Sequence, residues 1–160
     1  MYGEQEKVAY EKEVFLRFLS LIDSHVDKDT IRAGDPRKNE PDILCEFLHG
    51  GDAGFELGRL TNQTLKMVQK SRTPERYPYV WCGEDSLRQA RKKIRKRYSV
   101  NVPVKLLLYT EYPTSSPESY IREVVKPLAR SLNHQYAEIW FMGKDTATVI
   151  YERPLISLPN

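Results

Sequence analysis

Two apolar segments joined by a glycine-rich turn constrain the fold of this chain more than any other part of its sequence. The segments span residues 41–47 and 54–60, and the glycines within 50–54 are typical of a β-hairpin turn. Each strand-like segment contains an acid, Asp42 in the first and Glu56 in the second. Carboxylates are costly to bury unless a cation pairs with them. The pair therefore predicts a metal site or an ion-pair site on the hairpin.

The length and composition predict one globular domain. A chain of 160 residues with 40% hydrophobic and 29% charged residues can bury a core without disulfides. We expect a single domain over 1–153 and a tail over 154–160. The sequence contains two cysteines, no membrane-length apolar run and no secretory signal, which predicts a cytoplasmic protein with no membrane partner. The cysteines and the three histidines are scattered, so a zinc site is not expected.

Periodicity and turn residues predict the remaining elements. Apolar residues at helical spacing indicate an amphipathic helix near the start, and a near-continuous apolar run indicates a central strand. The order predicts an α/β or α+β fold with a mixed β-sheet flanked by helices. The expected elements besides the hairpin are a helix over 4–26, a loop over 27–40 with a short strand near 30–33, a short helix over 61–70, a loop over 71–83, a helix over 84–98, a strand over 102–110, a helix over 115–133 bent at Pro127, and a closing hairpin over 137–142 and 146–151.

Positive charge is concentrated in one part of the chain. Twelve of the 25 Lys and Arg residues lie within 62–105, against three acids there, so the remainder of the chain is net acidic. A basic helix can bind a polyanion, or it can simply present a solvated face. If it binds nucleic acid, the expected contacts are Arg88, Arg91, Lys92, Lys93, Arg95, Lys96 and Arg97.

The element order, together with Pro41-Asp42 and Glu56, resembles the PD-(D/E)xK nuclease superfamily, which has the restriction-endonuclease-like fold. The resemblance covers most of the chain from Glu4 to Thr110. It implies a nucleic-acid-binding protein that acts on DNA and can hydrolyse phosphodiesters with Mg²⁺ or Mn²⁺. The implied metal ligands are Asp42, Glu56 and a backbone carbonyl near Leu57.

The sequence departs from the superfamily at the catalytic lysine. Gly58 stands where the Glu-x-Lys motif has lysine, so a different residue must supply the amine or the protein is inactive. The possible donors are Arg59, Lys66, Lys70, Lys92, Lys93 and Lys96. Arg59 is nearest but alternates to the other strand face from Glu56. We therefore expect Lys92 or Lys96 of the basic helix to act as the catalytic lysine.

The hairpin register decides whether the acids meet. A turn centred near His49 puts Asp42 opposite Glu56, whereas a turn centred on Gly51 separates them and makes Glu46 the acid that faces Glu56. Glu46 is therefore a reserve ligand. The first helix offers two further reserve ligands through the resemblance, Glu11 and Glu13.

Three hypotheses follow from the sequence. The chain is an active metal-dependent endonuclease, or an inactive nuclease-fold module that binds nucleic acid or protein, or an unrelated α/β domain whose acids pair with basic residues. A homodimer is a further expectation from the resemblance. Carboxylates close together in a cleft with a lysine amine would favour the enzyme, and carboxylates on opposite faces would exclude it.

Overall fold

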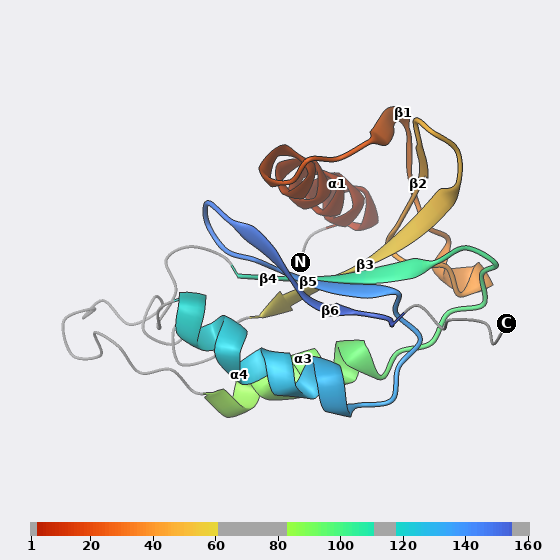
Figure 1. Ribbon diagram of the computed structural model, residues 1–160. Coiled ribbons are helices and arrows are strands. Elements are labelled where there is room, and N and C mark those ends of the chain that lie inside the picture. The colour runs from red at the N-terminus through yellow and green to blue at the C-terminus, as the bar shows by residue number, and fades with distance from the viewer. Residues whose placement is uncertain (1–2, 61–82, 111–117, 155–160) are drawn as a thin grey trace, which may run out of the picture.

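The computed structural model describes residues 3–60, 83–110 and 118–154, and these build one six-stranded sheet with helices on both faces (Figure 1). Within this part of the chain, the elements are α1 (Glu4–Leu21), β1 (Val26–Ala33), the 3-10 helix η1 (Pro36–Lys38), β2 (Ile43–Phe47), β3 (Asp52–Leu60), α3 (Gly83–Ile94), β4 (Val104–Thr110), α4 (Glu118–Ser131), β5 (Glu138–Met142) and β6 (Ala147–Glu152).

The sheet is mixed, and its spatial order follows the sequence from β1 to β6. β1 and β3 each run antiparallel to β2, which lies between them. β3, β4 and β5 are parallel, and β5 and β6 form an antiparallel hairpin. Parallel neighbours need a crossover, and the two crossovers contain α3 and α4. The predicted α+β class with a mixed sheet flanked by helices is confirmed.

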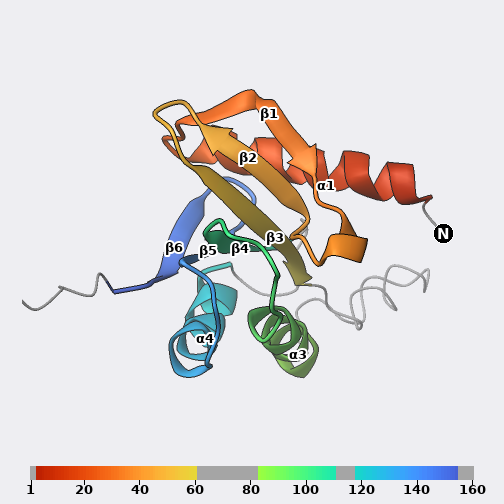
Figure 2. The ribbon, with the colours of Figure 1, turned by 90° about the vertical axis from the view of Figure 1, so that its right-hand side faces the viewer.

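The helices cover opposite faces of the sheet. In Figures 1 and 2, α1 lies across one face, while α3 and α4 lie beside each other on the other face. No helix among residues 3–60, 83–110 and 118–154 is long and apolar enough to cross a membrane.

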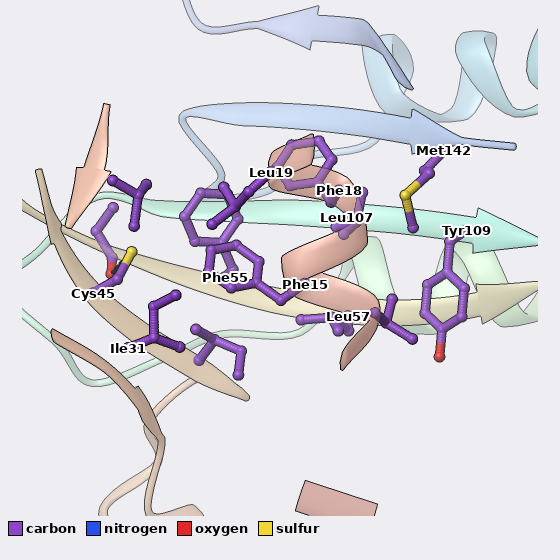
Figure 3. Packing of buried hydrophobic residues seen from close by; sticks show 14 residues of the cluster. Phe15, Phe18, Leu19, Ile31, Cys45, Phe55, Leu57, Leu107, Tyr109 and Met142 are labelled. Atoms are coloured by element: carbon purple, nitrogen blue, oxygen red, sulfur yellow. Dashed lines mark hydrogen bonds between the residues drawn. The ribbon is translucent and has the colours of Figure 1, made fainter. Parts of the chain in front are cut away.

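Aromatic side chains fill the space under α1. The Phe15 and Phe55 rings have centroids 4.7 Å apart, and Phe18 packs edge-on against Trp140 at 5.3 Å. Figure 3 shows these phenylalanines gathered with Leu57 and other apolar residues between the helix and the sheet. Such tilted ring pairs add specific geometry to a large buried apolar area.

The face under α3 and α4 has a more aliphatic core. Its fully buried members include Ile94, Leu106, Leu108 and Val125, and Tyr136 contributes a buried ring. Alternation along β3 directs Phe55 and Leu57 to the α1 side, and so directs Glu56 to the α3 side. The Glu56 carboxylate therefore points into the core between the sheet and the helices α3 and α4.

The first helix and the segment after it differ from the prediction. The helix ends at Leu21 instead of continuing to Val26, because Val26 is buried and begins β1, where it pairs with Phe47. The expected loop over 27–40 is largely strand: β1 spans Val26–Ala33, with an irregularity between Asp27 and Arg32. Exposed charged positions on this edge strand concealed its alternation.

Other boundaries shift by a few residues or fall outside the described part. The basic helix ends at Ile94 and not at Tyr98, so the last basic residues follow the helix. Pro127 lies inside α4, and the closing hairpin is confirmed as β5 and β6. The expected helix over 61–70, most of the loop over 71–83, the start of the helix expected at 115 and most of the tail over 154–160 lie outside the described residues.

Candidate functional site

Asp42 and Glu56 are brought together by the hairpin register. Ile43 pairs with Phe55 and Glu46 pairs with Asp52, which is the register of a turn centred on His49. The Asp42 backbone N–H donates to Glu56 Oε2 at 3.3 Å, and the Leu57 N–H donates to Asp42 Oδ2 at 2.9 Å. The register that places the two acids opposite each other is therefore confirmed.

Two lysine amines meet the Glu56 carboxylate. Lys93 Nζ lies 2.6 Å and Lys96 Nζ 2.9 Å from Glu56 Oε1, while Asp42 N–H donates to the other oxygen. The Glu56 side chain has no exposed surface, whereas the side chains of Lys93 and Lys96 are 30% and 47% exposed. A buried carboxylate is thus held between a strand of its own hairpin and the end of the basic helix.

The two carboxyl groups have opposite electrostatic environments. Burial and the neighbouring Glu56 charge raise the pKa of Asp42 to about 7, against the opposing effect of Lys93. Burial alone would raise the pKa of Glu56, but the charge and hydrogen bond of Lys93, together with the side chains of Tyr98 and Lys96, outweigh it, and the pKa of Glu56 is lowered. The site therefore holds one firmly ionised carboxylate beside one that resists ionisation, an arrangement found at catalytic sites.

The missing motif lysine has a geometric counterpart in Lys93. A Cβ atom built on Gly58 would lie 3.2 Å from Lys93 Cγ and 2.8 Å from Leu108 Cδ2. The stem of Lys93 therefore crosses the space into which a side chain at position 58 would project. Glycine at this position lets α3 approach the sheet and deliver its amine to Glu56.

Aromatic residues hold the end of α3 in place. The Tyr136 hydroxyl donates a 2.7 Å hydrogen bond to the Lys93 carbonyl, and Tyr136 is fully buried. The amine of Lys96 lies 5.2 Å from the centre of the Tyr98 ring, within cation–π range. These contacts fix the segment that carries both lysines.

A cleft of about 730 Å³ opens beside this group of charges. Its lining residues come from α1, β3, α3 and β4 and are Glu6, Lys7, Tyr10, Glu11, Leu57, Arg59, Lys93 and Tyr109. Lys93 and Leu57 connect the cleft with the acids, because the first bonds Glu56 and the second bonds Asp42. We refer to it as the α1 cleft.

One of the two lysines expected near the acids contacts Glu56. Lys96 reaches Glu56, as expected, but Lys92 is exposed and its neighbour Lys93 makes the shorter contact. Helical spacing offered a signal for this: Lys93 follows Ala90 by three positions, beside the buried stripe formed by Ala90 and Ile94, whereas Lys92 lies on the opposite side of the helix. Reasoning from the charge of the amines alone, without asking which side of the helix each lysine occupies, favours Lys92 over Lys93.

Of the three reserve ligands, only Glu11 lies near the acids. Glu46 pairs with Asp52 and is exposed, so it does not face Glu56. Glu13 is exposed on α1. Glu11 lines the α1 cleft, where it bonds Lys7 at 3.4 Å, and its charge contributes to the raised pKa of Asp42.

The basic residues do not all share one role. Arg88, Arg91, Lys92 and Arg95 are exposed at spacings that place them along one side of α3. We call these four the basic face. Arg97, beyond the helix, donates to the Asn133 carbonyl at 3.1 Å and ties α3 to the end of α4. Lys93 and Lys96 point to Glu56 instead.

The donor atoms at the acids fit a hard divalent cation in part. Asp42 and Glu56 supply carboxylate oxygens, and because the Leu57 N–H points at Asp42, the Leu57 carbonyl points to the same side of the extended strand. Mg²⁺ is commonly bound through one or two carboxylates with several waters retained. Among the described residues, no group of three or more His, Cys, Asp and Glu side chains is placed to hold a metal.

Comparisons with known protein families, with curated proteins and with solved structures find no match to this chain.

Proposed function

We propose that this protein binds nucleic acid and hydrolyses its phosphodiester bonds with a divalent cation, as a divergent relative of the PD-(D/E)xK nucleases. The observation that carries the proposal is the buried Glu56 carboxylate, which lies beside Asp42 and within 2.6 Å of the Lys93 amine. Two carboxylates with a lysine amine are the functional groups that this chemistry needs. The pKa of Asp42 is raised first by burial and then by the neighbouring Glu56 charge, and a bound cation would offset that charge.

The chain's own residues have separate roles in this proposal. Asp42, Glu56 and the Leu57 carbonyl would hold Mg²⁺ or Mn²⁺, which when bound would polarise the phosphate and lower the pKa of a water. Lys93 supplies the amine that the motif position lacks, and there it orients the attacking water and offsets charge that builds up on the phosphate. Lys96 gives Glu56 a second cationic partner.

The basic face positions the substrate. Arg88, Arg91, Lys92 and Arg95 contact phosphates that flank the reacting one, because Arg and Lys side chains bind the backbone without regard to sequence. Binding by this face releases counterions, so affinity falls steeply as salt increases.

Cleavage of labelled DNA tests the enzyme. Wild-type protein is expected to cut DNA in Mg²⁺ or Mn²⁺ but not in EDTA, and Glu56→Gln should lower the rate by at least about 100-fold because it removes a ligand charge. Lys28→Ala serves as the matched control, since Lys28 is exposed on the far edge strand β1. Wild-type and Glu56→Gln proteins that show the same absence of cleavage would remove the enzyme claim.

A lysine exchange tests the role of Lys93. Lys93→Ala should abolish cleavage and also clear the Cγ atom that a side chain at position 58 would meet at 3.2 Å, so that only Leu108 Cδ2, at 2.8 Å, must move aside. Adding Gly58→Lys to that variant should restore part of the activity, because the amine then returns from the motif position. Gly58→Lys alone should destabilise the protein. Full activity in Lys93→Ala would reject the assignment.

One observation favours a second candidate function, a nuclease-like module that binds without cutting. Glu56 Oε1 already accepts contacts from two amines, so the carboxylate is neutralised without a metal. In this case DNA affinity would be independent of Mg²⁺, and Glu56→Gln would change protein stability without changing a cleavage rate. Titration calorimetry with MgCl₂ separates the two functions, because only the enzyme binds the cation at Asp42 and Glu56.

A further inference from the structure

The α1 cleft combines features that the acids and the basic face do not explain. Its lining includes the rings of Tyr10 and Tyr109, three cations, Lys7, Arg59 and Lys93, and two carboxylates, Glu6 and Glu11. Tyr10 is one of the few large hydrophobic side chains that are exposed on the described surface, with 37% of its area accessible. An exposed ring beside cations is the combination on which proteins stack the bases of a strand while they bind its backbone.

The electrostatics of the cleft extend from the acids to α1. The pKa of Lys7 is raised, first by Glu11 and also by the charges of Asp42 and Glu56, although burial opposes the effect. Lys7 is therefore within the electrostatic field of the acids, across the cleft from β3. A phosphate in this cleft would lie between cations from α1, β3 and α3, and next to the group proposed to cut it.

The size of the cleft restricts what can enter. A volume of about 730 Å³ is in the range of small-ligand pockets, which suits one or two nucleotides. Bases in a duplex are stacked and paired, so their faces cannot meet Tyr10 unless they leave the helix. Bases of an unpaired strand present their faces without that cost.

We infer that the α1 cleft binds one or two nucleotides of an unpaired nucleic-acid strand, with a base stacked on Tyr10 and its phosphate between Lys7, Arg59 and Lys93. This inference rests on the proposed function in that it names the substrate of the same site. Single-stranded ends, flaps and loops of DNA or RNA share this chemistry. The cleft thus selects unpaired strand, while the basic face binds backbone of any kind.

Binding in EDTA tests the inference without requiring catalysis. Fluorescence anisotropy is measured with labelled dT12, labelled rU12 and a 12-base-pair duplex, and unlabelled thymidine monophosphate serves as competitor. Wild-type protein should bind one or both single strands about tenfold more tightly than the duplex. Tyr10→Ala should weaken that binding by about tenfold, since stacking is worth roughly 1–3 kcal/mol per base, and should leave duplex affinity within about twofold.

Matched variants separate stacking from folding. Tyr10→Phe keeps the ring and should bind single strands within about twofold of wild type. Tyr120→Ala removes another exposed tyrosine, on α4, and should have no effect on single-strand binding. Lys7→Gln leaves the ring in place and should weaken single-strand binding and reduce its salt dependence. Circular dichroism checks that each variant is folded.

Several results would overturn the inference. The protein binds no single strand, or it binds duplex as tightly as or more tightly than single strands. Tyr10→Ala has the same affinities as wild type. Thymidine monophosphate displaces the labelled strand at the same concentration as unlabelled dT12. The last result would indicate a free-nucleotide site. Preference for dT12 or for rU12 supports the inference equally and identifies the source of the strand.

The outcomes for the two proposals are distinguishable. If single strands bind at Tyr10 but no substrate is cut in Mg²⁺ or Mn²⁺, the cleavage claim fails and the cleft assignment stands. If DNA is cut in a Glu56-dependent way and Tyr10→Ala binds and cuts single strands as wild type does, the enzyme stands and the cleft assignment fails.

Discussion

The two faces of the sheet are built from the same strands but have different kinds of interior. Under α1, three phenylalanines and Trp140 pack with aliphatic neighbours, and the buried cluster contains no charged side chain within the described residues. Under α3, the same strand β3 inserts Glu56 into the protein, where it meets two lysines. The α1 face is optimised for burial, and the α3 face accepts the cost of a buried charge.

This difference separates stability from chemistry. Apolar burial is the dominant favourable term in folding, whereas a buried ion pair loses in desolvation much of what it gains in attraction. Glu56 is therefore expected to contribute less to stability than its central position suggests. A costly group kept at the centre of a sheet is more readily explained by function than by stability.

The largest expected effect is on the α1 face. Phe18→Ala should lower the free energy of unfolding by about 3–5 kcal/mol, because the ring is fully buried among other rings and leaves a cavity. Glu56→Gln should cost less, because the two lysines can turn to water. Urea denaturation of both variants, with exposed Leu16→Ala as the control on α1, measures this. A larger loss for Glu56→Gln would reverse the comparison.

The next effect depends on pH. Folding raises the pKa of Asp42 from 3.8 to about 7, so between these values the folded protein holds a proton that the unfolded chain has released, and stability falls as pH rises. Asp42→Asn removes this penalty. The advantage of the variant over wild type should be larger at pH 8 than at pH 5 by roughly 2–3 kcal/mol, as measured by urea denaturation at both values. An equal difference at both pH values would contradict the raised pKa.

A smaller effect on stability is expected at Tyr136, which holds the segment that carries the two lysines. Tyr136→Phe removes the hydrogen bond to the Lys93 carbonyl and should cost about 1 kcal/mol in stability. If the protein is active, the variant should lower kcat more than it changes KM, because it loosens the amine rather than the substrate contacts. A change in KM alone would indicate that Tyr136 acts on substrate binding.

The smallest effect concerns the solvent side of α3. Replacing Arg91 and Arg95 by Ala should leave the unfolding free energy within about 0.5 kcal/mol, since both are exposed. Duplex DNA affinity should fall, and the slope of log K against log salt should flatten by about 2. Anisotropy over a range of NaCl concentrations measures the slope. An unchanged slope would reject the basic face as the phosphate-binding surface.

The sequence predicted the parts of the fold that depend on local pattern. The hairpin, the central strand β4 and the closing hairpin follow from alternation and turn residues. The sequence left two hairpin registers open, and the structure has the one that places Asp42 opposite Glu56. Edge strand β1 was missed for most of its length, because its exposed positions carry charges and its pairing with β2 is irregular.

The site was less accessible to sequence reasoning. Gly58 could be recognised as a departure from a motif, but only the packing of α3 on β3 shows that Lys93 fills that space. Distance along the chain gave no indication that residue 93 would meet residue 56. The α1 cleft was equally hidden, because its lining residues come from four elements.

The separation between Glu56 and Lys93 has a consequence for the order in which the protein assembles. Every pair of adjacent strands is consecutive in the chain, so the hairpin that joins Asp42 and Glu56 closes a short loop and can form early. The lysines are synthesised about 40 residues later. Until α3 docks, the newly made hairpin carries both carboxylates without the amines that offset them. Because α3 lies between β3 and β4 in the chain, the step that completes the sheet also brings the lysine amines to the acids.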